Sequence, residues 1–190
     1  MTTLMNMEIK ELDEEDLARK AISDVDAFAE LYRQHVTRVY RYHMAHVGNV
    51  KDAEDLTSQT FMTAMEGIRS FRGDGSFAAW VMGIASKKRL MFFRGNRHEV
   101  PLEAVEHYPS PNLPTDKAAM ARIRLEAIAQ ALRQITSERS EAITLVYFGG
   151  LNYMEASRVM NKNEAAVKML VSRGLQDLRE RTSLRMEVEE

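Results

Sequence analysis

All four prolines of this 190-residue chain lie between residues 101 and 114. Proline breaks a helix interior because it lacks a backbone donor and clashes with the preceding turn. The stretch around these prolines, Glu99 to Lys117, has neither helical nor strand periodicity, which is typical of a linker. On both sides of it, apolar residues recur at spacings of three and four. The sequence therefore predicts an all-α fold: two small helical domains joined by a Pro-rich linker.

Helix signals divide the chain into five segments. We expect an acidic N-terminal extension at residues 1–22, a first helical domain at 23–98, a flexible linker at 99–117, a second helical domain at 118–183 and a tail at 184–190. The proline spacing favours an extended linker, with a rise of about 3 Å per residue. Such a linker would let the two domains separate widely.

Residue types that commonly cap the N-terminus of a helix stand just before several of the predicted helices. They are Ser23 or Asp24, Ser76, Asn152 and Asn163. Glu155 follows Asn152 by three residues, which is the spacing of a capping box. Gly48–Asn49 and Gly149–Gly150 are helix stops. Trp80 shares a helical face with apolar neighbours, so we expect it in the core. We also expect each domain to have a core of its own.

Composition excludes several classes of protein. The chain has no cysteine, which removes disulfide frameworks, cysteine-ligated zinc and thiolate nucleophiles. Its apolar runs are far shorter than the ~20 residues of a membrane helix, and its start lacks the pattern of a secretory signal. We therefore expect cytoplasmic localisation, no membrane insertion and no cofactor. A formal charge of −2 is unusual for a protein that binds DNA by itself.

The strongest functional pattern runs from Leu151 to Gly174. A short capped helix, a break at Asn161–Asn163 and a longer helix with Lys168 and Arg173 have helix-turn-helix spacing. In this motif the start of the second helix enters the major groove, while basic residues contact phosphates. The alternative is a simple helical hairpin, because Asn161 replaces the usual turn glycine.

A second pattern is a basic stretch without acids: Lys87, Lys88, Arg89, Arg94 and Arg97. Apolar and aromatic residues, including Phe92 and Phe93, interrupt it. Cations beside aromatic rings suit phosphate contacts and stacking on unpaired bases. The alternative is a solvated helix end with one phenylalanine turned into the core.

A third pattern is the acidic helix start with Asp52, Glu54 and Asp55. Acids at this position are stabilised by the helix dipole, so capping alone explains them unless a basic partner exists. His43 and His46 share one helix face but lack a third ligand at suitable spacing. We interpret them as ordinary helix residues rather than a metal site.

Three sequence motifs followed by the helix-turn-helix resemble bacterial sigma factors of the extracytoplasmic-function type, in the sigma-seventy family. The motifs are AFAELY at 27–32, DAEDLTSQTF at 52–61 and SFAAWVMGIASKK at 76–88. The resemblance covers residues 24–97 and 120–180. It implies a subunit that gives RNA polymerase its promoter specificity and has no catalytic residues. The implied partners are core RNA polymerase, promoter DNA and an anti-sigma factor, which many members have.

The resemblance also implies roles for the two domains, as regions 2 and 4 of a sigma factor. It implies polymerase-binding residues in the first domain: Asp52, Glu54, Asp55, Gln59 and Phe61. It implies contacts to the minus-ten element from the end of the same domain: Lys87, Lys88, Arg89, Arg94, Asn96 and Arg97. It implies contacts to the minus-thirty-five element from the second domain: Asn163, Glu164, Ala165, Ala166, Lys168 and Arg173.

The motifs depart from the family pattern at several positions. Members commonly have Gln-Glu before Thr-Phe, whereas this chain has Ser58–Gln59, which removes one acid from the implied polymerase-binding surface. Asn161–Lys162 replaces Gly-Ile in the turn. The family's base preference therefore cannot be transferred. Two alternatives stay open: a stand-alone helix-turn-helix regulator that dimerises on a palindrome, and a metal-dependent hydrolase using His43 and His46.

Overall fold

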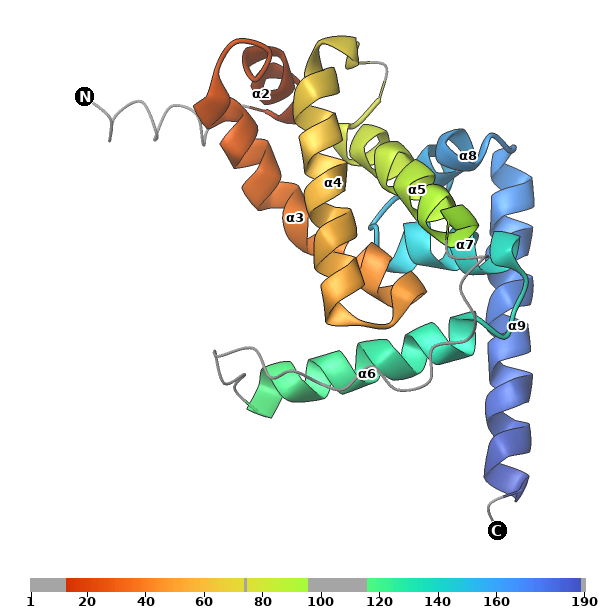
Figure 1. The fold of residues 1–190 in the computed structure, drawn as a ribbon. Helices are drawn as coiled ribbons and strands as arrows, with labels where there is room; N and C mark the ends of the chain where they lie inside the picture. Colours follow the sequence, from red (N-terminus) through yellow and green to blue (C-terminus); the bar gives the residue numbers. More distant parts are fainter. Residues whose placement is uncertain (1–12, 74, 96–115, 189–190) are drawn as a thin grey trace.

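The computed structural model describes residues 13–73, 75–95 and 116–188, and these ranges contain helices and no strand (Figure 1). The elements are α2 (Glu14–Lys20), α3 (Val25–Val47), α4 (Val50–Gly67), the 3-10 turn η1 (Ile68–Ser70), α5 (Phe77–Gly95), α6 (Asp116–Leu132), α7 (Ser137–Tyr147), α8 (Tyr153–Met160) and α9 (Glu164–Val188). The all-α prediction is confirmed. Most of the predicted linker lies outside the described residues.

Local capping chemistry sets the ends of the helices. The Asp24 carboxylate accepts hydrogen bonds from backbone N–H groups in the first turn of α3, and Asn49 does the same for α4. Gly48 ends α3 in a left-handed conformation, with a φ of 71°. The Ser76 hydroxyl accepts from a first-turn N–H of α5 at 3.1 Å. Asp24, Gly48 and Ser76 match the predicted helix boundaries, whereas Asn49, predicted as part of a helix stop, instead caps the next helix.

The first helical unit consists of α2, α3, α4 and α5. Its buried side chains include Leu31, Phe61 and Phe77, which come from α3, α4 and α5. Helix α2 lies in the predicted N-terminal extension, yet its Leu17 is fully buried in the same core. Glu14 of α2 also accepts a hydrogen bond from a first-turn N–H of α5 at 3.0 Å. The acidic segment is therefore partly built into the first unit.

The second helical unit consists of α6, α7, α8 and α9. Helix α7 packs against α9, where a Cβ added to Gly174 would lie 2.7 Å from Ile143. Glycine therefore permits a close approach of these two helices. Helix α6 lies across the end of α3, so that Leu132 and Ala45 share one buried cluster (Figure 1).

The two units share their largest hydrophobic cluster, which differs from the separate cores that the sequence predicts. Met82 of α5 belongs to the same cluster as Leu145, Ala156 and Val167 of the second unit. Each of these four side chains is buried. Amphipathic periodicity shows which face of a helix is buried but not which helix covers it, so this joint core was not predictable.

A buried polar cluster lies where the units meet. Glu141 of α7, only 6% exposed, is surrounded by side chains of the first unit. Its carboxylate accepts hydrogen bonds from the Tyr42 hydroxyl at 2.9 Å and from the Ser86 hydroxyl at 2.6 Å. It also lies 3.0 Å from Arg89 Nε and 3.3 Å from His46 Nε2. We call these five residues the Glu141 cluster.

The environment of the Glu141 cluster shifts several pKa values. Burial opposes ionisation of Glu141, but the hydrogen bond from His46 and the Arg89 charge outweigh it and lower the pKa of Glu141 to about 2. Burial lowers the pKa of His46. Burial also lowers the pKa of the adjacent His43 to about 3, and its Nε2 lies 3.0 Å from the Thr60 hydroxyl.

We expect the chain to lose stability as the pH falls below 6.5. His43 stays neutral in the folded chain. In the unfolded chain its pKa has the ordinary value of 6.5, so it binds a proton as the pH falls below that value. The unfolded state then binds more protons, so the free energy of unfolding falls by roughly 1 kcal/mol per pH unit for this histidine. Urea denaturation between pH 7.5 and pH 5 measures the slope.

The matched control is His43→Gln, whose amide can still hydrogen-bond the Thr60 hydroxyl but does not titrate. This variant should show a shallower dependence on pH over the same range, because unfolded carboxylates titrate mainly below pH 5. Equal slopes in the parent and the variant would show that His43 does not cause the effect.

Candidate protein and nucleic-acid interfaces

An acidic face lies on α4 in the first unit. Asn49 caps this helix and donates a side-chain hydrogen bond to Asp52 at 2.7 Å, which leaves Asp52 half-buried. Glu54, Asp55 and Gln59 are exposed. The capping interpretation therefore applies to Asp52, while the next two acids are free to contact a partner.

Apolar side chains adjoin these acids. Met62 and Met65 of α4 are 60% and 52% exposed, and Tyr32 of α3 is 42% exposed. A groove of about 280 Å³ between α3 and α4 is lined by both Tyr32 and Glu54. Phe61, predicted as a contact residue, is instead buried beneath Tyr32, with their ring centres 4.8 Å apart. Phe61 therefore belongs to the hydrophobic core beneath the acidic face of α4.

The basic stretch of α5 divides by exposure. Lys87 and Arg94 are exposed, and Lys88 is half-buried. Arg89 is buried in the Glu141 cluster, so in this arrangement it cannot contact a phosphate. Asn96 and Arg97, predicted to belong to the same site, lie outside the described residues.

The two phenylalanines of this stretch face different surroundings. Phe92 is half-buried and packs against Met44 and Leu56 near the end of α3 and the start of α4. Phe93 is 38% exposed, with its ring centre 5.3 Å from that of Phe92. One phenylalanine therefore packs inward, as predicted, while the other stays beside the exposed cations.

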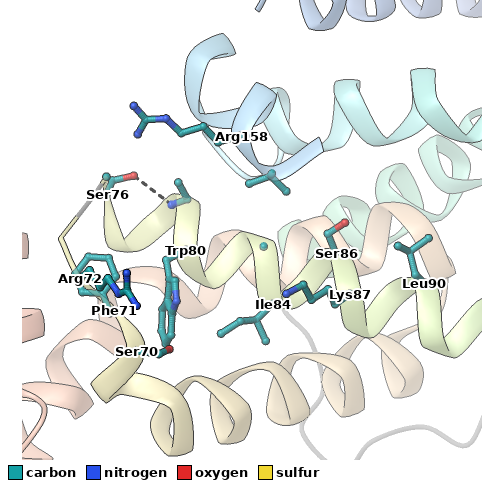
Figure 2. A pocket seen from close by; sticks show the side chains of 14 residues that line it. Ser70, Phe71, Arg72, Ser76, Trp80, Ile84, Ser86, Lys87, Leu90 and Arg158 are labelled. Carbon is teal, nitrogen blue, oxygen red and sulfur yellow. Dashed lines mark hydrogen bonds between the residues drawn. The ribbon is translucent and has the colours of Figure 1, made fainter. Parts of the chain in front are cut away.

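A pocket of about 580 Å³ lies between α5, the loop before it and α8. Trp80, Ile84 and Lys87 lie on the same side of α5 along this pocket, and Arg158 reaches the region from α8 (Figure 2). Trp80 was expected in the core but is half-buried. Its ring centre lies 5.6 Å from that of Phe71, and both residues line the pocket.

The helix-turn-helix geometry is built by short polar contacts. Asn152 and Glu155 form both hydrogen bonds of a capping box at the start of α8. Asn161 ends α8 in a left-handed conformation, with φ 51° and ψ 47°, so it takes the place of the usual turn glycine. Asn163 then accepts a hydrogen bond from the Ala166 N–H at 2.7 Å and begins α9.

The first turns of α9 present a mixed surface. Ala165, Lys168 and Arg173 are exposed, and Glu164 and Ala166 are half-buried. The Lys168 ammonium lies 2.6 Å from the Glu164 carboxylate, whose hydrogen bond and charge raise the pKa of Lys168. The residues predicted to contact the minus-thirty-five element thus lie in the first half of α9 and at its cap, and they differ in exposure.

The described ranges contain no group of three His, Cys, Asp or Glu side chains arranged to hold a metal ion. His43 and His46 are both buried, and they interact with Thr60 and Glu141. None of the described helices is long and apolar enough to cross a membrane.

Family comparisons identify the chain. The Sigma-70 region 2 family matches residues 31–99, and the Sigma-70 region 4 family matches residues 125–178. The sigma factor BldN of Streptomyces coelicolor is 34% identical over 167 residues, which are 84% of this chain and 62% of BldN. The chain belongs to the extracytoplasmic-function sigma factors of the sigma-70 family. The resemblance found in its motifs is thereby confirmed.

Two further comparisons agree with this assignment. The sigma factor SigK of Mycobacterium tuberculosis is 29% identical over 168 residues, covering 86% of this chain and 89% of SigK. The solved structure of RpoE with the anti-sigma factor NepR, from Bartonella quintana, has the same fold. Its TM-score is 0.62 at 22% identity, over 80% of this chain and 94% of RpoE. The first unit of this sigma factor carries the region 2 match and the second unit carries the region 4 match.

Asn161 gives a test of the turn in region 4. We expect Asn161→Gly to leave stability nearly unchanged, because glycine adopts the left-handed conformation freely. Asn161→Val should lower the free energy of unfolding by about 1–2 kcal/mol, since a β-branched residue is strained there. Urea denaturation of both variants measures this difference, and equal stabilities would contradict the proposed role of the turn.

Proposed function

We propose that this sigma factor binds core RNA polymerase and directs it to promoters, where it helps to open the DNA. The observation that carries the proposal is that each of the two units has a candidate DNA surface of its own. The region 2 unit has exposed cations beside a pocket with aromatic walls, and the region 4 unit has a helix-turn-helix. Members of the family are initiation factors rather than catalysts, so we infer no catalytic activity, no cofactor and a cytoplasmic site of action.

The acidic face of α4 is suited to a basic partner helix on polymerase. Glu54 and Asp55 are exposed and supply negative charge, while Met62 adds adaptable apolar surface. Charge complementarity speeds and orients association, and the buried apolar contact adds affinity. Gln59 lies between these groups on the exposed side of the helix.

The α5 surface is suited to a melted strand. Lys87 and Arg94 are exposed and can neutralise phosphates. Trp80 and Phe71 offer aromatic rings along the α5 side of the pocket, where an unstacked base could stack. Stacking on an aromatic side chain contributes about 1–3 kcal/mol per base. We propose that Lys88 and the more distal Asn96 and Arg97 extend this minus-ten surface.

The start of α9 is suited to duplex DNA. The exposed Ala165 and Lys168 lie where a recognition helix meets base edges, and Arg173 lies further along for phosphate. We keep the predicted division into a region 2 domain, a linker and a region 4 domain, with α2 added to the first domain. Because RpoE was solved with an anti-sigma factor, we also propose an anti-sigma partner for this chain.

The polymerase interface is tested by reversing charge at Glu54 and Asp55 together. Glu54→Lys with Asp55→Lys should weaken core polymerase binding at least tenfold, because two attractive contacts become repulsive. Asp52 is left intact because it takes part in the helix cap. The chain has no cysteine, so one introduced thiol carries the fluorophore for an anisotropy titration.

The matched control is Glu138→Lys with Glu180→Lys, which changes the net charge equally but lies on the region 4 unit. Its affinity for core polymerase should stay near that of the parent. If both double variants bind equally well, the acidic face of α4 is not the polymerase interface.

Substitutions in the two proposed DNA surfaces should have different effects on promoter melting and promoter occupancy. Lys87→Ala with Arg94→Ala should leave promoter-bound holoenzyme in which the minus-ten thymines stay unreactive to permanganate. Lys168→Ala with Arg173→Ala should lower occupancy while each bound complex melts normally, because duplex phosphate contacts are lost. The footprint uses a promoter selected from random DNA by the parent holoenzyme. Normal melting by the first variant would refute the α5 assignment.

A further inference from the structure

The contact between the two units conceals part of the proposed DNA surface. Arg89 belongs to the basic stretch of α5, yet it is buried while Lys87 and Arg94 are exposed. Its partner, Glu141, comes from the other unit and lies 3.0 Å from its Nε. Arg89 therefore becomes available for DNA only when the region 4 unit moves away.

We propose that the Glu141 cluster is an intramolecular latch that keeps this sigma factor in a closed form unable to engage a promoter. The proposal rests on the proposed function. In the closed form, Glu141 occupies the position that a phosphate would take beside Arg89. Opening of the latch returns the arginine to the minus-ten surface and frees the region 4 unit.

Other contacts of the same interface cover the pocket of α5. Ser76, at the start of α5, donates a hydrogen bond to Glu155 of α8. Arg158 and Val159 of α8 line the pocket together with Trp80 (Figure 2). The helix-turn-helix thus forms one wall of the pocket that we propose for an unstacked base. Separation of the units widens access to that pocket as it frees Arg89.

Promoter geometry requires the closed form to open. The minus-ten and minus-thirty-five elements are about 25 base pairs apart, which corresponds to roughly 85 Å at 3.4 Å per base pair. In the structure the two units share one hydrophobic cluster, with Met82 and Leu145 in the same core. Units packed in this way cannot reach both elements at once.

The buried polar groups of the interface suit a contact between the units that can both close and open. A buried ion pair pays a large desolvation cost, so an apolar replacement would hold two permanently associated units equally well or better. Glu141, Arg89 and Tyr42 all regain water when the units separate. The region 2 unit keeps core contacts of its own, such as the packing of Phe61 against Tyr32. A polar centre therefore fixes the closed arrangement without making it irreversible.

The first experiment measures the distance between the units in the full chain. Gln34→Cys on α3, away from the groove beside the acidic face, and Gln176→Cys on α9 place two exposed thiols in a chain without native cysteine. Single-molecule energy transfer between labels at these positions reports the closed and open populations. Glu141→Gln keeps the shape of the side chain but removes its charge, and it should raise the open-to-closed ratio about tenfold.

The second experiment measures binding of the same proteins to core RNA polymerase. If only the open form binds, the apparent affinity is reduced by the fraction of open molecules. Glu141→Gln should therefore bind more tightly by the same factor as its gain in open population. The matched control is Glu138→Gln, on the same helix but exposed and paired with Lys162 within the region 4 unit. It should change neither readout.

A second variant tests the latch independently, in case Glu141→Gln does not fold. Arg133, which follows α6, donates a hydrogen bond to the Val47 carbonyl at the end of α3. Arg133→Ala removes this contact between the units without leaving a buried charge, and it should shift both readouts in the same direction. Unchanged populations in both variants, with cooperative unfolding retained, would overturn the latch.

The outcomes separate the latch from the proposed function. If the parent and every variant fail to bind core polymerase, the proposed function fails, while the label distances still test the closed form. If all proteins bind polymerase equally although Glu141→Gln is more open, the function stands and the inhibitory role of the latch is refuted.

Discussion

The burial of the Glu141 carboxylate is the constraint on which the relative placement of the two units depends. A buried charge is tolerated only where enough donors converge on it. Here Tyr42 and His46 approach from α3, and Ser86 and Arg89 approach from α5. A rotation or a sliding of α7 would remove some of these donors while the charge stayed buried. The hydrophobic contacts around the cluster supply affinity between the units, whereas the carboxylate fixes their register.

The helices were predictable because their signals are local. Asp24 and the pair Asn152–Glu155 each act within about one turn, so their roles can be read from adjacent residues. The joint core was not predictable, because periodicity does not reveal which helix covers an apolar face. The burial of Leu17 was missed for the same reason, since the acids around it indicate only a solvated extension.

The exposure of the candidate site residues was only partly predictable from the sequence. A run of cations predicts a phosphate surface on α5, and Lys87 and Arg94 are exposed as that prediction requires. Nothing near Arg89 in the sequence indicates its burial, because Glu141 lies in another helix beyond the linker. Phe61 likewise follows the family pattern for a contact residue, whereas the structure places it in the core.

Ion pairs offset part of the positive charge on both of the proposed DNA surfaces. Glu164 lies 2.6 Å from Lys168 at the start of α9, and Glu141 is paired with Arg89 at the α5 surface. A phosphate must replace these carboxylates, so part of its binding energy is spent on breaking existing ion pairs. Free affinity for DNA is thereby reduced on both units. Under the proposed function, polymerase would hold both surfaces against the promoter at the same time and so raise their effective concentration.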